Sequence, residues 1–330
     1  MMLDDRKAAT LAAVVHEYIH TALPVGSSLV SRSPGIEVSP ATVRGEMALL
    51  EDQGYLAQPH TSAGRIPTDK GYRFFVDLLR HNEPSLQASD EGRVKEFFDD
   101  AHGELESILA HTSELLTTLT DCAAVVVGPT SDAATIRSTQ LVDLSTHIAM
   151  VVAVMSNGVI EKRTVEVAKE LTPDIVEEAA RRLSAAVEGK TLIELGADLL
   201  RDDDPLLVAA IDALHAAGQL AEVYVGGASR VASAFEAVDQ IRDVLTILEQ
   251  QIVVVSLIRG VLDRGMRVAI GEETGMEPLS ECSLVVAPYA IEGELAGTIG
   301  VLGPTRMDYS QALSAVAVVS RRLGRALSEG

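Results

Sequence analysis

The sequence predicts an α+β protein in which a small, mainly helical N-terminal domain precedes a larger domain of strands and helices. Residues 4–80 show helical apolar spacing and then a short hairpin pattern. Beyond residue 120, strand-like runs give way to helical runs and then to strands again, which is typical of an α+β domain interrupted by a helical insertion. The chain has 330 residues, of which 47% are hydrophobic, and this suffices for two or three domains with aliphatic cores.

Charge is distributed unevenly along the chain. Residues 1–80 carry eight Lys or Arg and nine Asp or Glu side chains, a net of −1, whereas the whole chain has a formal net charge of −21. The remaining residues therefore hold a net charge of −20, and within residues 59–80 the basic side chains outnumber the acidic ones. A polyanion would be tolerated at the N-terminal end and repelled elsewhere, although ordinary surface charge is the alternative interpretation.

Cysteine content and apolar runs indicate the compartment. Cys122 and Cys282 are far apart in sequence and show no metal-ligand spacing, which favours buried structural thiols in a reducing environment. The first residues lack an apolar leader, and the longest apolar runs are too short to span a bilayer. We therefore expect a soluble, cytoplasmic protein with no membrane partner.

The first helix of the N-terminal domain is expected over residues 4–22. Its apolar stripe consists of Leu11, Val14, Val15, Tyr18 and Ile19. The segment "LPVGS" then breaks the helix, and residues 27–32 have room for one or two short turns. A second full helix is expected after this break.

The helix expected over residues 39–54 is well signalled at both ends. Ser39 fits the N-cap, Pro40 fits the first helical position, and Gly54 fits a left-handed stop. Helix, short turn and capped helix are typical of a helix-turn-helix, and a plain three-helix bundle is the alternative. In a helix-turn-helix, residues off the apolar face would meet DNA base edges, namely Ser39, Thr42, Arg44 and Gly45.

A hairpin pattern follows this helix. Residues 55–59 and 65–68 predict two short strands joined by the small-residue tip "HTSAG". A hairpin placed directly after a recognition helix is a wing, whose small tip lets the backbone approach a phosphate or the minor groove. The residues expected to serve this contact are His60, Thr61, Ser62 and Arg65, with Lys70 and Arg73 just beyond.

The N-terminal and C-terminal motifs together resemble those of the HrcA family of heat-inducible transcription repressors. The resemblance rests on "SPATVRGEMALLEDQGYLAQPHTSAGRIPTDKGYRFFVD" near the start and on "VAIGEE", "LVVAPY" and "GTIGVLGPTRMDY" near the end. Because the matches lie at opposite ends with a plausible length between them, the resemblance covers essentially the whole chain. At Gly45 this chain departs from the family pattern, which has asparagine there.

The resemblance implies a repressor of chaperone operons that binds an inverted-repeat operator on double-stranded DNA as a homodimer. It also implies a winged-helix domain, a GAF-like domain and an inserted dimerisation domain, with activity that depends on the chaperonin. Asparagine can pair bidentately with adenine, whereas glycine has no side chain, so the base contact that the family resemblance implies at this position does not carry over directly to Gly45.

The family architecture sets the expected domain borders. The winged helix-turn-helix is expected over residues 1–80, and the other segments are a linker (81–92), the first part of the GAF-like domain (93–172), the inserted dimerising segment (173–225) and the second part of the GAF-like domain (226–330). One helix is expected from about residue 93 to 120, with a seam for a partner helix.

Neither a catalytic site nor a cofactor or metal site is expected. The glycine-bearing hairpins do not open a helix after a strand, so they are not a dinucleotide fingerprint. The carboxylates of Glu272, Glu273 and Glu277 could be acid–base groups or metal ligands, but a solvated loop is the favoured interpretation.

Two other functions stay open at this point. One is a small-molecule-responsive repressor that uses the GAF-like domain as a sensor. The other is an enzyme or scaffold that uses its winged helix for protein contacts. Ligand titration tests the first, and the effect of deleting residues 1–80 on DNA binding tests the second.

Overall fold

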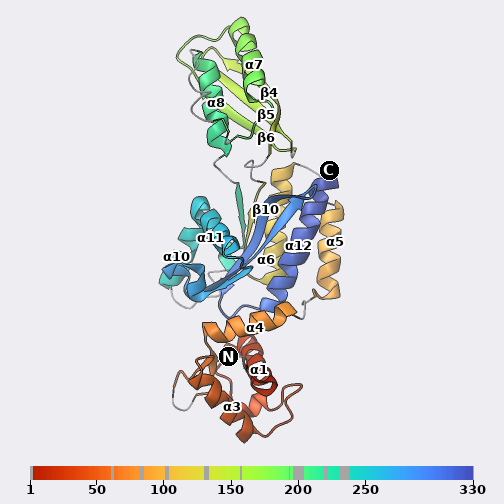
Figure 1. Cartoon of the computed structure of the whole chain (residues 1–330), viewed down its shortest axis with the longest axis vertical. Coiled ribbons are helices and arrows are strands. Elements are labelled where there is room, and N and C mark those ends of the chain that lie inside the picture. Colours follow the sequence, from red (N-terminus) through yellow and green to blue (C-terminus); the bar gives the residue numbers. More distant parts are fainter. Residues whose placement is uncertain are drawn as a thin grey trace.

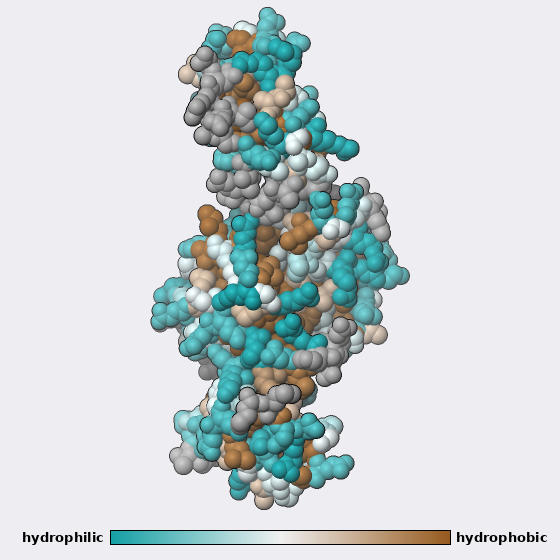
Figure 2. Space-filling model, in the orientation of Figure 1, coloured by the Kyte–Doolittle hydropathy of each residue, from teal (hydrophilic) through white to brown (hydrophobic). Residues whose placement is uncertain are grey.

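The molecule is elongated and consists of three units in a row (Figure 1). The N-terminal unit (residues 3–81) lies at one end, the distal unit (134–218) lies at the other, and the central unit (85–129 and 222–329) joins them. The computed structural model describes residues 3–60, 63–81, 85–100, 104–129, 134–156, 158–192, 194–195, 204–218, 222–230 and 238–329. Figure 2 shows hydrophilic residues over most of the visible face of all three units, as the high charge of the chain requires.

The N-terminal unit contains the predicted order of helices and hairpin. Leu11, Val14, Val43 and Leu50 are fully buried in its core, which confirms the two expected apolar stripes. The two strands pair antiparallel, with Leu56 opposite Pro67. The elements are α1 (Asp5–Thr21), α2 (Ser27–Val30), α3 (Pro40–Asp52), β1 (Leu56–Ala57), β2 (Ile66–Pro67) and α4 (Asp69–His81).

The central unit is a five-stranded antiparallel sheet in the order β7-β3-β10-β9-β8. Every residue of β3 is buried, and alternate side chains serve opposite faces: Val126 packs with α6 and α12, whereas Val125 packs with α10 and α11. Helix α5 lies outside α12 (Figure 1). The strands are β3 (Ala123–Val127), β7 (Val223–Gly226), β8 (Val268–Ile270), β9 (Cys282–Ile291) and β10 (Glu294–Pro304). The helices are α5 (Ala88–Asp100), α6 (Leu105–Thr120), α10 (Val238–Glu249), α11 (Gln251–Asp263), the short η2 (Gly271–Thr274) and η3 (Glu277–Leu279), and α12 (Tyr309–Glu329).

The distal unit has a sheet and a core of its own. Its three strands pair only with one another, in the order β4-β5-β6, and two helices cover one face of this sheet. The unit leaves and re-enters the central sheet between neighbouring strands, because Val127 of β3 lies opposite Val223 of β7. Its elements are β4 (Ile136–Ser145), β5 (Ile148–Met155), β6 (Ile160–Glu166), α7 (Pro173–Val187) and α8 (Pro205–Gly218).

Two expected borders need correction. The strands β4 to β6 belong with α7 and α8, so the interrupting unit begins before residue 136 and not at residue 173. The segment expected as one helix over 93–120 forms two helices, because Glu104 has extended backbone angles (φ −68°, ψ 143°) ahead of α6. Helix α5 also begins at Ala88, inside the expected linker.

Within the described ranges, no single helix combines the length and the apolar character needed to cross a bilayer. Helices α10 and α11 reach that length only as a pair, with a bend of 94° between them.

Candidate nucleic-acid interface

One side of helix α3 is anchored and the other side is open. Ser39 caps the helix as predicted, since its Oγ accepts a hydrogen bond from the Thr42 backbone N–H at 3.2 Å. The side chains of Val43, Glu46, Met47 and Leu50 are buried. The predicted DNA-facing residues are all exposed on the other side, namely Ser39, Thr42, Arg44 and Gly45.

Arg44 and Gly45 leave this open side available for contact. Arg44 has no hydrogen bond or ion pair with any residue that the structure describes. A Cβ atom placed on Gly45 would have no neighbour within 4 Å, so a larger residue would fit there. The first two turns of α3 therefore present one cation and a flat surface to solvent.

The anchored side contains a carboxylate that sequence reasoning missed. Glu46 Oε1 accepts hydrogen bonds from Arg6 of α1, with an Nη2–Oε1 distance of 2.6 Å and an Nε–Oε1 distance of 2.9 Å. Its Oε2 atom is buried and has no hydrogen-bond partner among the described residues. The ion pair joins α1 to the middle of α3 and leaves the opposite side of α3 facing solvent.

The hairpin is fixed against the segment between α1 and α2. The backbone N–H of Arg65 donates to the Val25 carbonyl at 2.9 Å, and the Val25 N–H donates back at 2.8 Å. Gly64 must be glycine, because a Cβ there would collide with the Val25 carbonyl. His60 is exposed at the tip, and the expected contacts Thr61 and Ser62 lie outside the described residues.

The two remaining cations near the hairpin have partners in the N-terminal unit. Arg65 forms an ion pair with Glu51 of α3, in which both Nε and Nη2 lie 2.8 Å from Oε2. Lys70 Nζ donates to the Gln53 carbonyl at 2.7 Å, and it lies 4.3 Å from the centre of the Tyr55 ring. Both side chains therefore hold the hairpin and α4 against the C-terminal end of α3.

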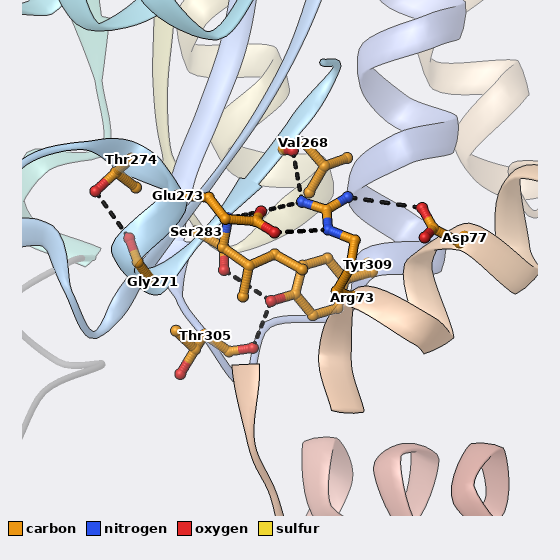
Figure 3. Close-up of polar contacts among 10 residues, drawn as sticks. Arg73, Asp77, Val268, Gly271, Glu273, Thr274, Ser283, Thr305 and Tyr309 are labelled. Carbon is orange, nitrogen blue, oxygen red and sulfur yellow. Dashed lines mark hydrogen bonds and ion pairs between the residues drawn. The ribbon is translucent and has the colours of Figure 1, made fainter. Parts of the chain in front are cut away.

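The structure places Arg73 away from the other expected DNA contacts. Its guanidinium points from α4 into the central unit, where it contacts Glu273 and the Val268 carbonyl (Figure 3). Glu273, expected in a solvated loop, is thus a partner of a basic residue 200 positions earlier. No local pattern could reveal this pair, because it is a contact between units.

Arg32 is a further cation that sequence reasoning did not select. It follows α2 in the turn before α3, is exposed, and has no ion pair with any described residue. Like Arg44 and His60, it is an exposed basic or titratable group near α3 and the hairpin.

Comparison with known proteins places the chain in a family. The family model for the HrcA protein C-terminal domain matches residues 106–313. Curated relatives named heat-inducible transcription repressor HrcA align with this chain over nearly its full length and nearly their own. The relative from Pelotomaculum thermopropionicum is 36% identical over 99% of this chain and 97% of its own, and the one from Acidothermus cellulolyticus is 38% identical over 99% and 100%.

A solved structure shows the same fold. This crystal structure, described as that of a hypothetical protein at 2.2 Å resolution, matches with a TM-score of 0.68 and 25% identity over 99% of both chains. The sequence matches and the structural match both extend over all three units. The chain therefore belongs to the HrcA family of heat-inducible transcription repressors, which are regulators of transcription and not enzymes.

Proposed function

We propose that this heat-shock repressor binds an inverted-repeat operator as a dimer, with the N-terminal unit acting as a winged helix. The open face of α3 carries this proposal: Thr42, Arg44 and Gly45 are exposed, whereas the opposite face of the helix is buried. In a helix-turn-helix, the N-terminal residues of the second full helix meet base edges in the major groove. The hairpin then lies beside the DNA backbone, with His60 at its tip.

The distal unit offers a surface for the second copy. Along β5, Ala149, Val151 and Ala153 are buried against the helices, while the alternate residues lie on the opposite face. The β5 residues of that opposite face are all apolar, and Ile160, which pairs with Val154, is 53% exposed. Its apolar residues are Val142, Ile148, Met150, Val152, Val154 and Ile160, and the polar partners Gln140, Lys162, Thr164 and Glu166 flank them on the same face. We propose that two copies meet through this face, since a contiguous apolar patch is typical of an interface.

We propose that the central unit is the GAF-like domain implied by the family and that the repressor works in the cytoplasm. The topology of this unit supports chaperonin-assisted folding. Strand β3 pairs with β10, so that Val126 lies opposite Ile299, and the whole distal unit lies between them in sequence. Pairing over such a separation is slow and leaves apolar strands exposed. We therefore infer that free chaperonin sets the fraction of active repressor.

A small pocket in the central unit supports a second candidate function, that of a small-molecule sensor. It has a volume of about 320 Å³ and lies between α11 and the start of β10. Its lining is largely apolar and includes Val255, Ile258, Leu262 and Ala296, which is the character of a small-molecule site. Calorimetric titration with a panel of small apolar acids, followed by release from operator DNA, tests this role.

The proposed function is tested by sedimentation of the full chain with DNA from a chaperone promoter that contains an inverted repeat. We expect two chains per operator, and we expect much weaker binding to a scrambled duplex of the same length. A single chain bound to one half-site would contradict the dimer, and equal binding to both duplexes would contradict operator recognition. Refolding of the denatured chain with and without chaperonin and ATP, read as operator binding, tests the folding proposal.

A further inference from the structure

Helix α4 joins the N-terminal unit to the central unit through a defined polar contact. Arg73 Nε donates to Glu273 Oε1 at 2.9 Å, and Nη2 donates to Glu273 Oε2 and, at 2.8 Å, to the Val268 carbonyl. Nη1 lies 3.7 Å from Asp77 on the next turn of α4 (Figure 3). The side chains of Arg73 and Glu273 are 23% and 34% exposed, so the pair is largely shielded from water. A bidentate arginine–carboxylate pair fixes direction as well as distance.

Glu273 is itself held in place from the central unit. Its Oε2 atom also accepts a hydrogen bond from the Ile270 backbone N–H at 2.9 Å, at the end of β8. Arg73 therefore contacts a carboxylate whose position follows the edge of the central sheet. Rotation of α4 would break both hydrogen bonds of the bidentate pair together.

Two further contacts fix α4 against the same region. Gly271 has a left-handed backbone (φ 53°), and a Cβ there would collide with the Asp69 carboxylate, so glycine permits the close approach. The rings of Tyr72 and Tyr309 lie 5.8 Å apart. Tyr309 is locked in turn, because its hydroxyl lies 2.7 Å from Ser283 Oγ and donates to the Thr305 carbonyl at 2.6 Å (Figure 3).

The opposite side of α4 is joined just as closely to α3 and the hairpin. Thr68 Oγ1 donates to the Gly54 carbonyl at 2.7 Å, directly after the end of α3. Lys70 Nζ donates to the Gln53 carbonyl at 2.7 Å, and Val76 is fully buried in the N-terminal core. Helix α4 is therefore one rigid piece that contacts α3 on one side and the central sheet on the other.

We infer that the Arg73–Glu273 pair is a positioning contact that sets the direction of α3 relative to the central unit, and hence the half-site spacing that a dimer accepts. This inference rests on the proposed function, because spacing has a meaning only for two copies on one operator. In such dimers, half-sites are separated by about one helical turn (10–10.5 bp) or a multiple of it, so a change in the direction of α3 changes the accepted spacing. Arg73 acts through α3 and does not itself touch DNA.

The test uses operators in which the spacer between the half-sites is shortened or lengthened in single base pairs, together with an isolated half-site. We expect the wild-type chain to prefer one spacer. Arg73→Ala and Glu273→Gln should each flatten this preference and weaken binding to the best spacer by roughly tenfold or more, because the two half-sites no longer bind as one rigid unit. Affinity for the isolated half-site should stay unchanged in both variants.

The double variant and a neighbouring arginine serve as controls. The double variant should be no worse than either single variant, because both remove the same contact. Arg80→Ala changes an exposed arginine on the same helix that has no ion pair with any described residue, and it should keep the wild-type spacer profile. Loss of half-site binding in Arg73→Ala alone would overturn the inference and make Arg73 a DNA contact. An unchanged spacer profile in both variants would overturn it as well.

A measurement without DNA separates this inference from the proposed function. Spin labels on Asp52→Cys in α3 and Arg325→Cys in α12 report the distance between the two units, since both sites are exposed and both native cysteines are buried. We expect one narrow distance distribution in the wild-type background and a broad one with Arg73→Ala. If the wild-type chain failed to bind any operator but Arg73→Ala still broadened the distance distribution, the proposed function would fail while the positioning contact stood. Identical narrow distributions would refute the contact whatever the DNA results.

Discussion

Arg65 of the hairpin donates from both Nε and Nη2 to a single carboxylate oxygen of Glu51 on α3, at 2.8 Å each. The pair holds the guanidinium between α3 and the hairpin, and in the proposed DNA complex a phosphate would lie beside it. We predict that Arg65→Ala weakens binding to operator and scrambled DNA alike. The slope of log K against log salt concentration should become shallower by about one, as expected for the loss of one phosphate contact. Binding curves at several salt concentrations measure both effects.

Glu51→Gln is the matched control for this prediction. It keeps the size of the side chain and leaves the Arg65 charge in place, so the salt slope should stay as in the wild type. If Arg65→Ala and Glu51→Gln gave the same loss with unchanged slopes, Arg65 would only support the hairpin.

Arg44 should determine base discrimination. It is the exposed cation near the start of α3 and has no partner among the described residues. We expect Arg44→Ala to lose about 1–3 kcal/mol on the operator, as for a bidentate contact with guanine, and to lose much less on scrambled DNA. Competition binding with single-base operator variants identifies the base read. Equal losses on both duplexes would reduce Arg44 to a phosphate contact.

Gly45 weakens α3 without a packing reason. Because a Cβ there meets open space, Gly45→Ala should stabilise the chain by about 0.5–1 kcal/mol, the helix penalty of glycine. The midpoint of urea unfolding measures this gain. Gly45→Asn tests specificity, since it restores the family residue and should favour operators with adenine at the facing position. A loss of stability in Gly45→Ala would show that the position is constrained in the folded chain.

The two cysteines should be unreactive toward alkylating reagents in the folded chain. Burial raises the pKa of Cys122 to about 12, with a further contribution from Asp121, and burial raises the pKa of Cys282 to about 12 as well. At pH near 8 almost no thiolate is therefore present. We expect alkylation by iodoacetamide to be negligible until urea unfolds the chain, when both thiols should react. Rapid labelling of either cysteine in the native state would contradict their burial.

Asp69 should make the chain less stable as the pH rises. Burial raises the pKa of Asp69 above its ordinary value of 3.8, and Glu272 and Glu273 add to this, while a hydrogen bond from the Glu272 backbone N–H opposes it. Because the folded-state pKa is the higher one, the folded chain holds this proton longer, and stability falls from the unfolded-state pKa up to the folded-state pKa. The stability of Asp69→Asn relative to the wild type should therefore increase with pH over this range. A difference between their unfolding midpoints that stayed the same at every pH would contradict the raised pKa.

Asp4→Asn is a control of opposite sign. The side-chain hydrogen bond from Lys7 lowers the pKa of Asp4, so its contribution is present above the unfolded-state pKa and is lost as the pH falls through the folded-state pKa. This variant should be less stable than the wild type at neutral pH, and the difference in stability should disappear at acid pH.

Local signals in the sequence were enough to predict α3 and the hairpin. Ser39 caps the helix and the apolar face is buried, because capping and helical spacing act between residues that are close along the chain. Position along the chain also placed Thr42, Arg44 and Gly45 on the open side, since residues on opposite faces of a helix follow a fixed period.

Contacts between distant segments could not be predicted in this way. Arg73 was assigned to the DNA because a basic residue beside a hairpin has that meaning locally, whereas its partner Glu273 lies in another unit. The strands β4 to β6 were recognised as strands, but alternation does not tell which sheet a strand joins. Burial of Glu46 depended on Arg6, and a charged side chain in a helix would otherwise be expected in solvent.

Because Arg73 and Glu273 are far apart in sequence, Arg73 is synthesised well before its partner. Helices α1 to α4 are made early, but Glu273 lies 200 residues after Arg73 in the chain. At roughly 5–20 residues per second, the ribosome needs ~10–40 s to reach it. During that interval α3 is present on the nascent chain without the Arg73–Glu273 contact. A transcript truncated before residue 268 would release a unit that still presents α3 but lacks the surface that orients it.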